Sequence, residues 1–193
     1  EKAKLSYTFY NGQQLSDIHD GLQNNHIVDA HAYSVSFLNA NTDPSIELQG
    51  QSSFFENYYL GDKLSWVSGV KSYKRQVQKN IYEGVDFYLL INDDKLKYEL
   101  YLDKSANEKE IKLKYEGLSH IKISNGNLVI NTSVNNIVEY RPYAYQIIQD
   151  IEVEVLCNYL LKNNIISFDF PNDYNRNYPL VIDPVLEFST YSG

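Results

Sequence analysis

A few histidine and aspartate side chains are the first groups in this sequence that could carry chemistry. His19, Asp20, His26 and Asp29 all fall within residues 13–30, a polar and weakly patterned stretch. Imidazole and carboxylate groups bind metal ions, but the spacing of these four matches no standard ligand motif. We therefore interpret residues 13–30 as a solvated loop and predict no metal site.

The single cysteine and two further histidines have a structural explanation. Cys157 shares the apolar side of an alternating stretch with Val153 and Val155, so we expect a buried thiol and not a nucleophile. His31 and His120 flank expected strands, where a histidine is usually only hydrogen-bonded. With one cysteine in the chain, an internal disulfide is excluded.

Acidic residues leave the question of catalysis open. The chain has 25 Asp and Glu residues, and a glycosidase needs only two carboxylates that face each other across a cleft. No nucleophile elbow, P-loop, dinucleotide fingerprint or zincin motif is present. We therefore predict no catalytic, cofactor-binding or metal-binding residues and no cofactor, and we expect the chain to lack hydrolase activity.

Tyrosine is the unusual feature of the composition, with 18 residues in a chain of 193. Tyrosine favours strands and can lie half-buried with its hydroxyl in water, so a tyrosine-rich β surface is the simpler interpretation. The functional alternative is a face that binds sugar or protein. Its candidate residues are Tyr58, Tyr59, Trp66, Tyr143 and Tyr145. Trp66 is first expected to pack in the core or at its rim.

The charge of the chain limits its partners. A net charge of −8 and a pI of about 5.0 argue against nucleic acid, which needs a basic stripe, and against adsorption to an anionic membrane. No apolar run approaches the roughly 20 residues of a membrane span, so direct insertion is not expected. The sequence has no signal peptide and no initiating Met, which suggests a processed form or a fragment.

The hydrophobic pattern predicts strands. Apolar and polar residues alternate through Lys95–Leu102 and again through Ile111–Glu116, and we predict that these two strands pair antiparallel. Asn125-Gly126 predicts a two-residue type I′ turn, because both residues tolerate a positive φ. The continuous apolar run Val85–Ile91 suggests a central strand buried on both faces.

Other short strands and turns complete the pattern. Strands are expected at Leu5–Tyr10, His31–Leu38, Ile46–Leu48, Val67–Tyr73 and Ile165–Phe170, with turns at Asn92–Asp94, Gln149-Asp150 and Asn163-Asn164. We predict an all-β fold, an antiparallel β-sandwich or open barrel with short hairpin turns and little helix. The chain is expected to form a single β-rich module over residues 1–193, with two packed subdomains at about 1–92 and 93–193 as a possible division.

Several segments together resemble one known family. They are His31–Asn41, Asn57–Asp62 with Trp66, Asn80–Asp86, Leu96–Leu100, Ile111–Gly117, Gly126–Asn131, Arg141–Gln146, and Tyr178–Pro184 with Phe188–Tyr191. The chain is similar to the uncharacterised N-terminal β-module of large secreted Bacteroidota surface proteins. In that family the module precedes SBBP-type β-propeller repeats or PKD-like domains, and a C-terminal sorting domain directs type IX secretion.

The resemblance implies an extracellular or cell-surface location, export across the outer membrane, and downstream domains of the same polypeptide as partners. It supplies no catalytic residue. Two functions remain open: a non-catalytic structural or adhesive module, and a glycan-binding or glycan-processing domain. A cell-surface glycan or protein is a further possible partner. We also predict that Pro179–Gly193 is an ordered strand pair, interrupted at Pro184, that leads to a following domain.

Overall fold

The computed structural model describes residues 3–22, 26–92, 95–184 and 186–188. The first part of the chain contains β1 (Lys4–Tyr10), α1 (Gly12–His19), β2 (Ala30–Phe37), β3 (Ser45–Tyr58), β4 (Val67–Tyr82), β5 (Val85–Asn92) and β6 (Lys95–Leu102). The second part contains β7 (Leu113–Glu116), β8 (His120–Ser124), β9 (Asn127–Asn131), β10 (Asn136–Glu139), β11 (Tyr143–Ile148), β12 (Ile151–Val155), β13 (Asn158–Lys162), β14 (Ile165–Asp169), β15 (Leu180–Asp183) and β16 (Leu186–Phe188). Two 3-10 turns lie at Lys63–Ser65 and Glu108–Glu110.

The strands form three antiparallel sheets. Their orders are β1-β2-β7-β14-β13, β16-β10-β9-β8 and β12-β11-β15-β6-β5-β4-β3. The two larger sheets both combine strands from the beginning and the end of the chain. The all-β, sandwich-like prediction is therefore confirmed, and the division into two subdomains stays a prediction.

A single core joins the sheets, because each strand turns its apolar side inward. In β2 the buried residues are Tyr33, Val35 and Phe37, and in β6 they are Tyr98, Leu100 and Leu102. The cluster extends through β9, β14 and β15, so all three sheets contribute to one core. Burial of this apolar area is the main favourable contribution to folding.

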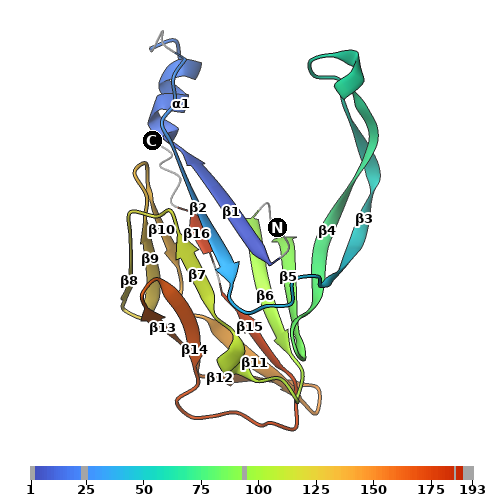
Figure 1. Cartoon of the computed structure of the whole chain (residues 1–193), viewed down its shortest axis with the longest axis vertical. Coiled ribbons are helices and arrows are strands. Elements are labelled where there is room, and N and C mark those ends of the chain that lie inside the picture. The colour runs from blue at the N-terminus through green and yellow to red at the C-terminus, as the bar shows by residue number, and fades with distance from the viewer. Residues whose placement is uncertain (1–2, 23–25, 93–94, 185, 189–193) are drawn as a thin grey trace.

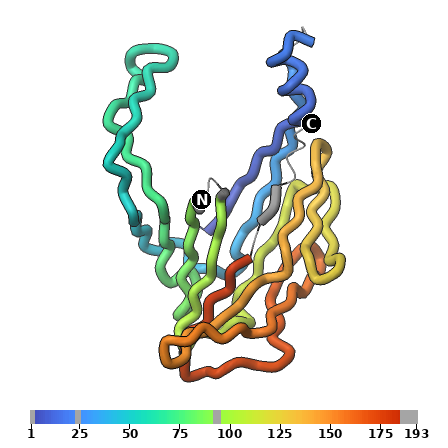
Figure 2. Tube along the Cα trace, turned by 180° about the vertical axis from the view of Figure 1, so that it is seen from behind, coloured from blue at the N-terminus to red at the C-terminus, as the bar shows by residue number. Residues whose placement is uncertain are grey.

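Two hairpins project from the body as separate arms, visible from both sides (Figures 1 and 2). One is the far end of the β1–β2 hairpin, with α1 at its tip. Asn11 begins α1, and its side chain accepts a hydrogen bond from the Gln14 N–H. The other is the far part of β3–β4. We call residues 50–74 the hairpin arm, and none of its side chains is buried.

Several predicted turns are confirmed. Asn125 and Gly126 have φ angles of 52° and 81°, and Ser124 pairs with Asn127 across a two-residue turn. Gln149-Asp150 and Asn163-Asn164 also have positive φ at both positions. In each case the preceding and following strands pair directly. Of the predicted turn at Asn92–Asp94, residues 93 and 94 lie outside the described part.

The predicted pairing of Lys95–Leu102 with Ile111–Glu116 is wrong. β6 pairs with β5 and β15 in the seven-stranded sheet, and β7 pairs with β2 and β14 in the five-stranded sheet. The connection between them, with its 3-10 turn at Glu108–Glu110, crosses from one sheet to the other. Two amphipathic strands that are close in sequence can each find better partners elsewhere, because tertiary packing decides the pairing.

Other predictions need correction. Residues 13–30 are not all loop, since α1 covers Gly12–His19. The prediction that β5 is buried on both faces is wrong: Val85 and Phe87 on one face are buried, Asp86, Tyr88 and Leu90 on the other are only half-buried, and Ile91 is 57% exposed. The short strands expected at Ile46–Leu48 and Val67–Tyr73 are parts of the much longer β3 and β4.

The C-terminal strands are in part as predicted. β15 and β16 lie on either side of Pro184, but they belong to different sheets and do not form a pair. Residues 185 and 189–193 lie outside the described part of the chain. Among the described residues, no helix has the length and hydropathy needed to cross a bilayer.

Candidate functional site

Three of the predicted aromatic residues come together at the end of the hairpin arm. The Tyr59 and Trp66 rings meet edge to face, with centroids 5.2 Å apart, and Lys63 Nζ lies 5.8 Å from the Trp66 ring centre. Tyr58 pairs with Val67 across the hairpin, and its hydroxyl donates to the Glu56 carboxylate. Trp66 is 43% exposed and is neither in the core cluster nor packed against it, so the expectation that it packs in the core or at its rim is wrong.

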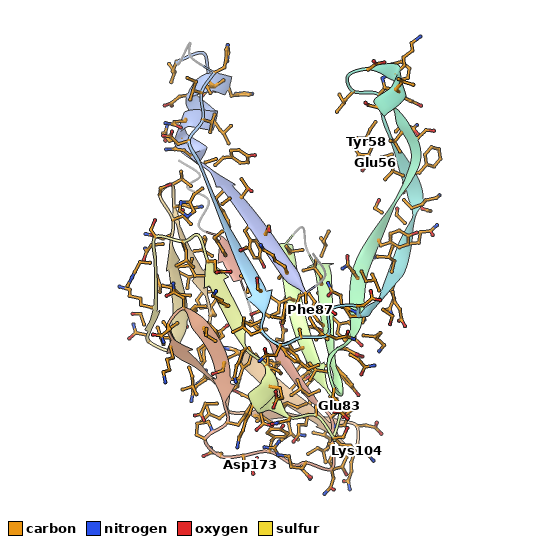
Figure 3. All side chains as sticks on the ribbon, viewed as in Figure 1. Glu56, Tyr58, Glu83, Phe87, Lys104 and Asp173 are labelled. Carbon is orange, nitrogen blue, oxygen red and sulfur yellow. The ribbon has the colours of Figure 1, made fainter. Side chains whose placement is uncertain are left out.

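The arm exposes more apolar surface than these three rings. Phe54 is 79% exposed and Leu64 is 95% exposed, and Phe55, Leu60 and Val70 are also accessible. Figure 3 places Tyr58 and Glu56 far from the body, which contains Phe87. Exposed apolar side chains gathered in one element are typical of an interaction site.

The other two predicted aromatic residues lie on a different surface. Tyr143 and Tyr145 stack on β11, with ring centroids 5.6 Å apart. The Tyr143 hydroxyl donates a 2.7 Å hydrogen bond to the Glu152 carboxylate. This hydrogen bond raises the pKa of Tyr143 to about 12. Four strands separate β11 from β3 in the sheet, so the five candidates form two groups and not one face.

A third tyrosine, on β6, lies on the same face of the sheet as the tyrosine pair on β11. Tyr145 pairs with Val181 of β15, and Val181 pairs in turn with Tyr101 of β6. Directly opposed residues point to the same face of a sheet, so Tyr145 and Tyr101 share one face. All these tyrosines are half-buried. This tyrosine face, defined by Tyr101, Tyr143 and Tyr145, is open to water and carries Glu152 beside it.

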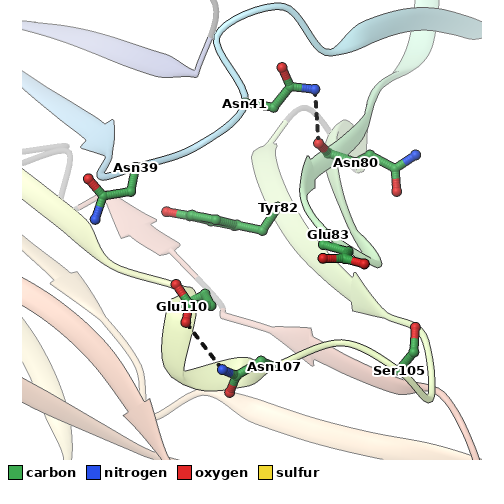
Figure 4. A pocket seen from close by; sticks show the side chains of 8 residues that line it. All are labelled: Asn39, Asn41, Asn80, Tyr82, Glu83, Ser105, Asn107 and Glu110. Carbon is green, nitrogen blue, oxygen red and sulfur yellow. Dashed lines mark hydrogen bonds between the residues drawn. The ribbon is translucent and has the colours of Figure 1, made fainter.

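A polar pocket of about 570 Å³ opens near the ends of β2 and β4 (Figure 4). Three separate segments meet there: the loop after β2, the turn between β4 and β5, and the connection after β6. The pocket is lined by Asn39, Asn41, Asn80, Tyr82, Glu83, Ser105, Asn107 and Glu110. Sequence reasoning missed this site, although Asn39, Asn41, Asn80 and Glu83 lie in two of the segments that carry the family resemblance.

The backbone around the pocket is fixed by buried and charged groups. The Tyr82 hydroxyl donates to the Leu38 carbonyl at 3.0 Å and accepts from the Lys112 N–H at 3.4 Å, which ties three segments together. Asn80 lies in a β-bulge with φ of 51°, and its N–H donates to Asp86 Oδ1 at 2.8 Å. A bulge of this type redirects side chains away from the regular pleat.

A buried carboxylate with three tyrosine partners lies outside all of these sites. Glu139 is 1% exposed and accepts hydrogen bonds from Tyr98, Tyr159 and Tyr115. Burial raises the Glu139 pKa, and the three tyrosine hydroxyls oppose that effect. Because the cluster lies in the core and lines none of the pockets described above, we assign it to the architecture and not to catalysis.

The structure also places the cysteine and a histidine that were singled out in the sequence. Cys157 is 1% exposed, and burial raises its pKa to about 12, so the predicted burial is confirmed. His31 is hydrogen-bonded to the Gly117 carbonyl at 2.7 Å, as expected. In the part of the chain that the structure describes, no group of three or more His, Cys, Asp or Glu side chains could hold a metal ion.

Comparison with known proteins identifies the family and nothing beyond it. A search of curated proteins found no match, and no solved structure matches. One family model, described as a domain of unknown function (DUF7948), matches residues 1–185. That match covers nearly the whole sequence and every strand from β1 to β15, so the chain belongs to the DUF7948 family.

Proposed function

We propose that this chain is a non-catalytic structural and adhesive module of a secreted or cell-surface protein, and that the hairpin arm is its contact element. The observation that carries the proposal is the exposed apolar end of the arm, with Phe54, Leu64 and Trp66 all open to water. A long hairpin without a single buried side chain gains little from the body. A partner that covers the arm would provide the burial that the chain itself does not.

The partner that best fits the proposal is another domain of the same polypeptide. The resemblance to the N-terminal modules of Bacteroidota surface proteins supports this choice, since such modules precede SBBP-type repeats or PKD-like domains and travel by type IX secretion. A cell-surface protein is the second choice. The low isoelectric point, near 5.0, weighs against nucleic acid as a partner.

Hydrogen exchange tests the proposal. Amide protection of residues 50–74 is measured in the isolated chain and in a longer polypeptide that includes the following domain. We expect the arm to exchange rapidly when isolated and to be protected in the longer protein, because burial of its apolar side chains stabilises the hairpin. Equal protection of the arm in both proteins would show that it has no partner within the polypeptide.

A matched pair of variants sharpens the test. Phe54→Ser combined with Leu64→Ser removes two exposed apolar side chains of the arm, while Ile151→Ser combined with Leu160→Ser removes two that lie elsewhere. Both double variants should melt at nearly the wild-type temperature, since none of the four side chains is buried. In the longer polypeptide, only the arm variant should lose the added amide protection of residues 50–74.

A second candidate function is glycan binding or glycan processing, and the tyrosine face favours it. Tyr101, Tyr143 and Tyr145 present aromatic rings and hydroxyls on one open face, with the Glu152 carboxylate at 2.7 Å from the Tyr143 hydroxyl. Aromatic rings that are open to solvent bind apolar ligand faces, and their hydroxyls donate or accept hydrogen bonds. Retention of Tyr145→Ala on a polysaccharide affinity gel would be reduced if this candidate is correct, and unchanged retention would exclude it.

A further inference from the structure

We propose that the polar pocket lined by Asn39, Asn80 and Glu83 binds one or two residues of an uncharged oligosaccharide. This site is distinct from both the hairpin arm and the tyrosine face, and the proposal does not depend on either. It rests on the chemistry of the lining side chains, on their charge and on the rigidity of the backbone that holds them.

The lining matches the hydrogen-bonding capacity of hydroxyl groups. Asn39, Asn41, Asn80 and Asn107 supply amides, Ser105 supplies a hydroxyl, and Glu83 and Glu110 supply carboxylates. An amide both donates and accepts, and a carboxylate accepts at two oxygens. A sugar hydroxyl also donates and accepts, so adjacent hydroxyls can pair with an amide and a carboxylate at the same time.

Several of these groups are available to a ligand. Among the described residues, neither the side-chain amides of Asn39 and Asn80 nor the Glu83 carboxylate has a hydrogen-bond or ion-pair partner. By contrast, the Asn107 amide donates to Glu110 at 3.2 Å, and its oxygen accepts from the Lys109 N–H. Asn39, Asn80 and Glu83 are therefore the groups expected to make new contacts.

The charge of the lining selects against anions. Two carboxylates line the pocket, and no Lys or Arg is among the lining residues. A ligand with a carboxylate or sulfate group would be repelled by Glu83 and Glu110. A metal ion is also disfavoured, since no cluster of three His, Cys, Asp or Glu side chains occurs in the described residues. An uncharged, hydroxyl-rich ligand is the one that uses the amides, the Ser105 hydroxyl and the carboxylates together.

The site is formed before a ligand arrives. Asn39 and Asn80 both adopt positive φ, at 57° and 51°, a region in which asparagine is favoured over most other residues. Asp86 holds the Asn80 bulge, and the Asn41 N–H donates to the Ile81 carbonyl at 2.8 Å. A fixed backbone reduces the ordering cost of binding. The volume of about 570 Å³ also falls within the range of small-molecule sites, roughly 300–1,000 Å³.

The experiment uses the whole chain and a panel of neutral oligosaccharides: xylo-, cello-, malto- and manno-oligosaccharides. Binding is detected by saturation-transfer NMR and quantified by titration calorimetry. The pocket variants are Glu83→Gln and Asn80→Gly. Glycine tolerates the positive φ of residue 80 and removes the whole side chain with its amide, whereas alanine would be strained at this φ.

Matched controls separate binding from folding. Asn163→Gly makes the same change at another exposed asparagine with φ of 52°, in the turn between β13 and β14, and Glu116→Gln removes a surface carboxylate on β7. All four variants should keep the wild-type melting temperature to within a few degrees. We expect at least one oligosaccharide to bind the wild type and both controls alike, and to bind each pocket variant at least about tenfold more weakly.

Three results would overturn the proposal. The first is that no member of the panel binds. The second is that both pocket variants bind as tightly as the controls. The third is that binding is lost in Tyr145→Ala or Trp66→Ala but is unchanged in Glu83→Gln and Asn80→Gly. This last result would assign sugar binding to the tyrosine face or the arm and would leave the second candidate function intact.

Discussion

The Tyr98 hydroxyl donates a 2.6 Å hydrogen bond to Glu139 Oε1, and this bond joins the seven-stranded sheet to the four-stranded sheet inside the core. Tyr159 of the five-stranded sheet donates to the same oxygen at 2.7 Å, and Tyr115 reaches Oε2 at 3.4 Å. One buried carboxylate thus contacts all three sheets. Because a buried polar group is costly unless it is hydrogen-bonded, these contacts favour one arrangement of the sheets over others.

Glu139→Ala should lower the free energy of unfolding by about 3 kcal/mol or more, because it leaves buried tyrosine hydroxyls without their acceptor. Tyr98→Phe should cost less, about 1–2 kcal/mol, since Glu139 keeps its bond to Tyr159. Tyr101→Phe, on the outward face of the same strand, is the control and should change little. Urea unfolding at pH 7 measures all three. Equal stabilities for Glu139→Ala and Tyr101→Phe would contradict the assigned role.

The same carboxylate predicts a pH dependence. Burial raises the Glu139 pKa above the 4.5 expected for an exposed glutamate. At a pH between the Glu139 pKa of the unfolded chain and the higher pKa of the folded chain, the native state binds more protons than the unfolded state. The contribution of Glu139 to stability is therefore fully present below about pH 4.5 and is lost as the pH rises through its folded-state pKa. Wild type should therefore lose stability relative to Glu139→Gln as the pH rises above about 4.5. Two stability curves that stay parallel over this range would refute the prediction.

The thiol of Cys157 should be unreactive in the native protein. It is 1% exposed, and burial raises its pKa to about 12, so almost no thiolate exists at neutral pH. We expect an aromatic disulfide reagent to label it only as fast as the chain unfolds, and to label it completely in denaturant. Rapid labelling without denaturant would show that the core opens locally near β13.

Gly84→Ala should be more destabilising than Gly126→Ala. Gly84 has φ of 70°, and an added Cβ would lie 2.7 Å from Asp103 Oδ1, which also accepts hydrogen bonds from the Ser105 N–H and hydroxyl. Gly126→Ala is the matched control, because its φ is also positive but its Cβ would meet only ordinary contacts with Arg141. Backbone strain costs both variants about 1–2 kcal/mol, and the overlap adds to it at Gly84 alone. Similar melting temperatures for the two would show that Asp103 moves freely.

Local features of this fold could be predicted from the sequence because their causes are local. Asn125-Gly126 and Asn163-Asn164 form turns since asparagine and glycine tolerate positive φ, whatever surrounds them. The alternation around Tyr98 and Leu100 predicts a strand with one buried face for the same reason. Helix α1 was missed because its eight residues bury no side chain, so no apolar stripe marks them.

Long-range features could not be predicted in this way. Nothing in the alternation of β6 and β7 states which sheet each joins, and neither strand pairs with the other. The hairpin arm has no buried face, so its strands lack the period of two that would reveal their length. The pocket brings Asn39, Asn80 and Asn107 together from three segments, and no spacing within the sequence indicates that they meet.

Deletion of residues 179–193 tests the role of the C-terminal segment. β15 lies inside the seven-stranded sheet, where it pairs with β11 on one side and β6 on the other. Leu180 and Ile182 are almost completely buried, and loss of such a side chain alone costs about 2–5 kcal/mol. Together with the lost strand pairing, the free-energy cost of the deletion should exceed the free energy of unfolding of a typical domain, about 5–15 kcal/mol. We therefore expect the shortened chain not to fold cooperatively.

A shorter deletion provides the control for this experiment. Removal of residues 189–193 leaves β15 and its two partner strands intact, so this variant should give a cooperative thermal transition at close to the wild-type temperature. Circular dichroism melting compares the three proteins. A longer deletion that still melts like wild type would mean that β11 and β6 can close the sheet without β15. The segment would then be a linker, and the boundary of the module would lie before residue 179.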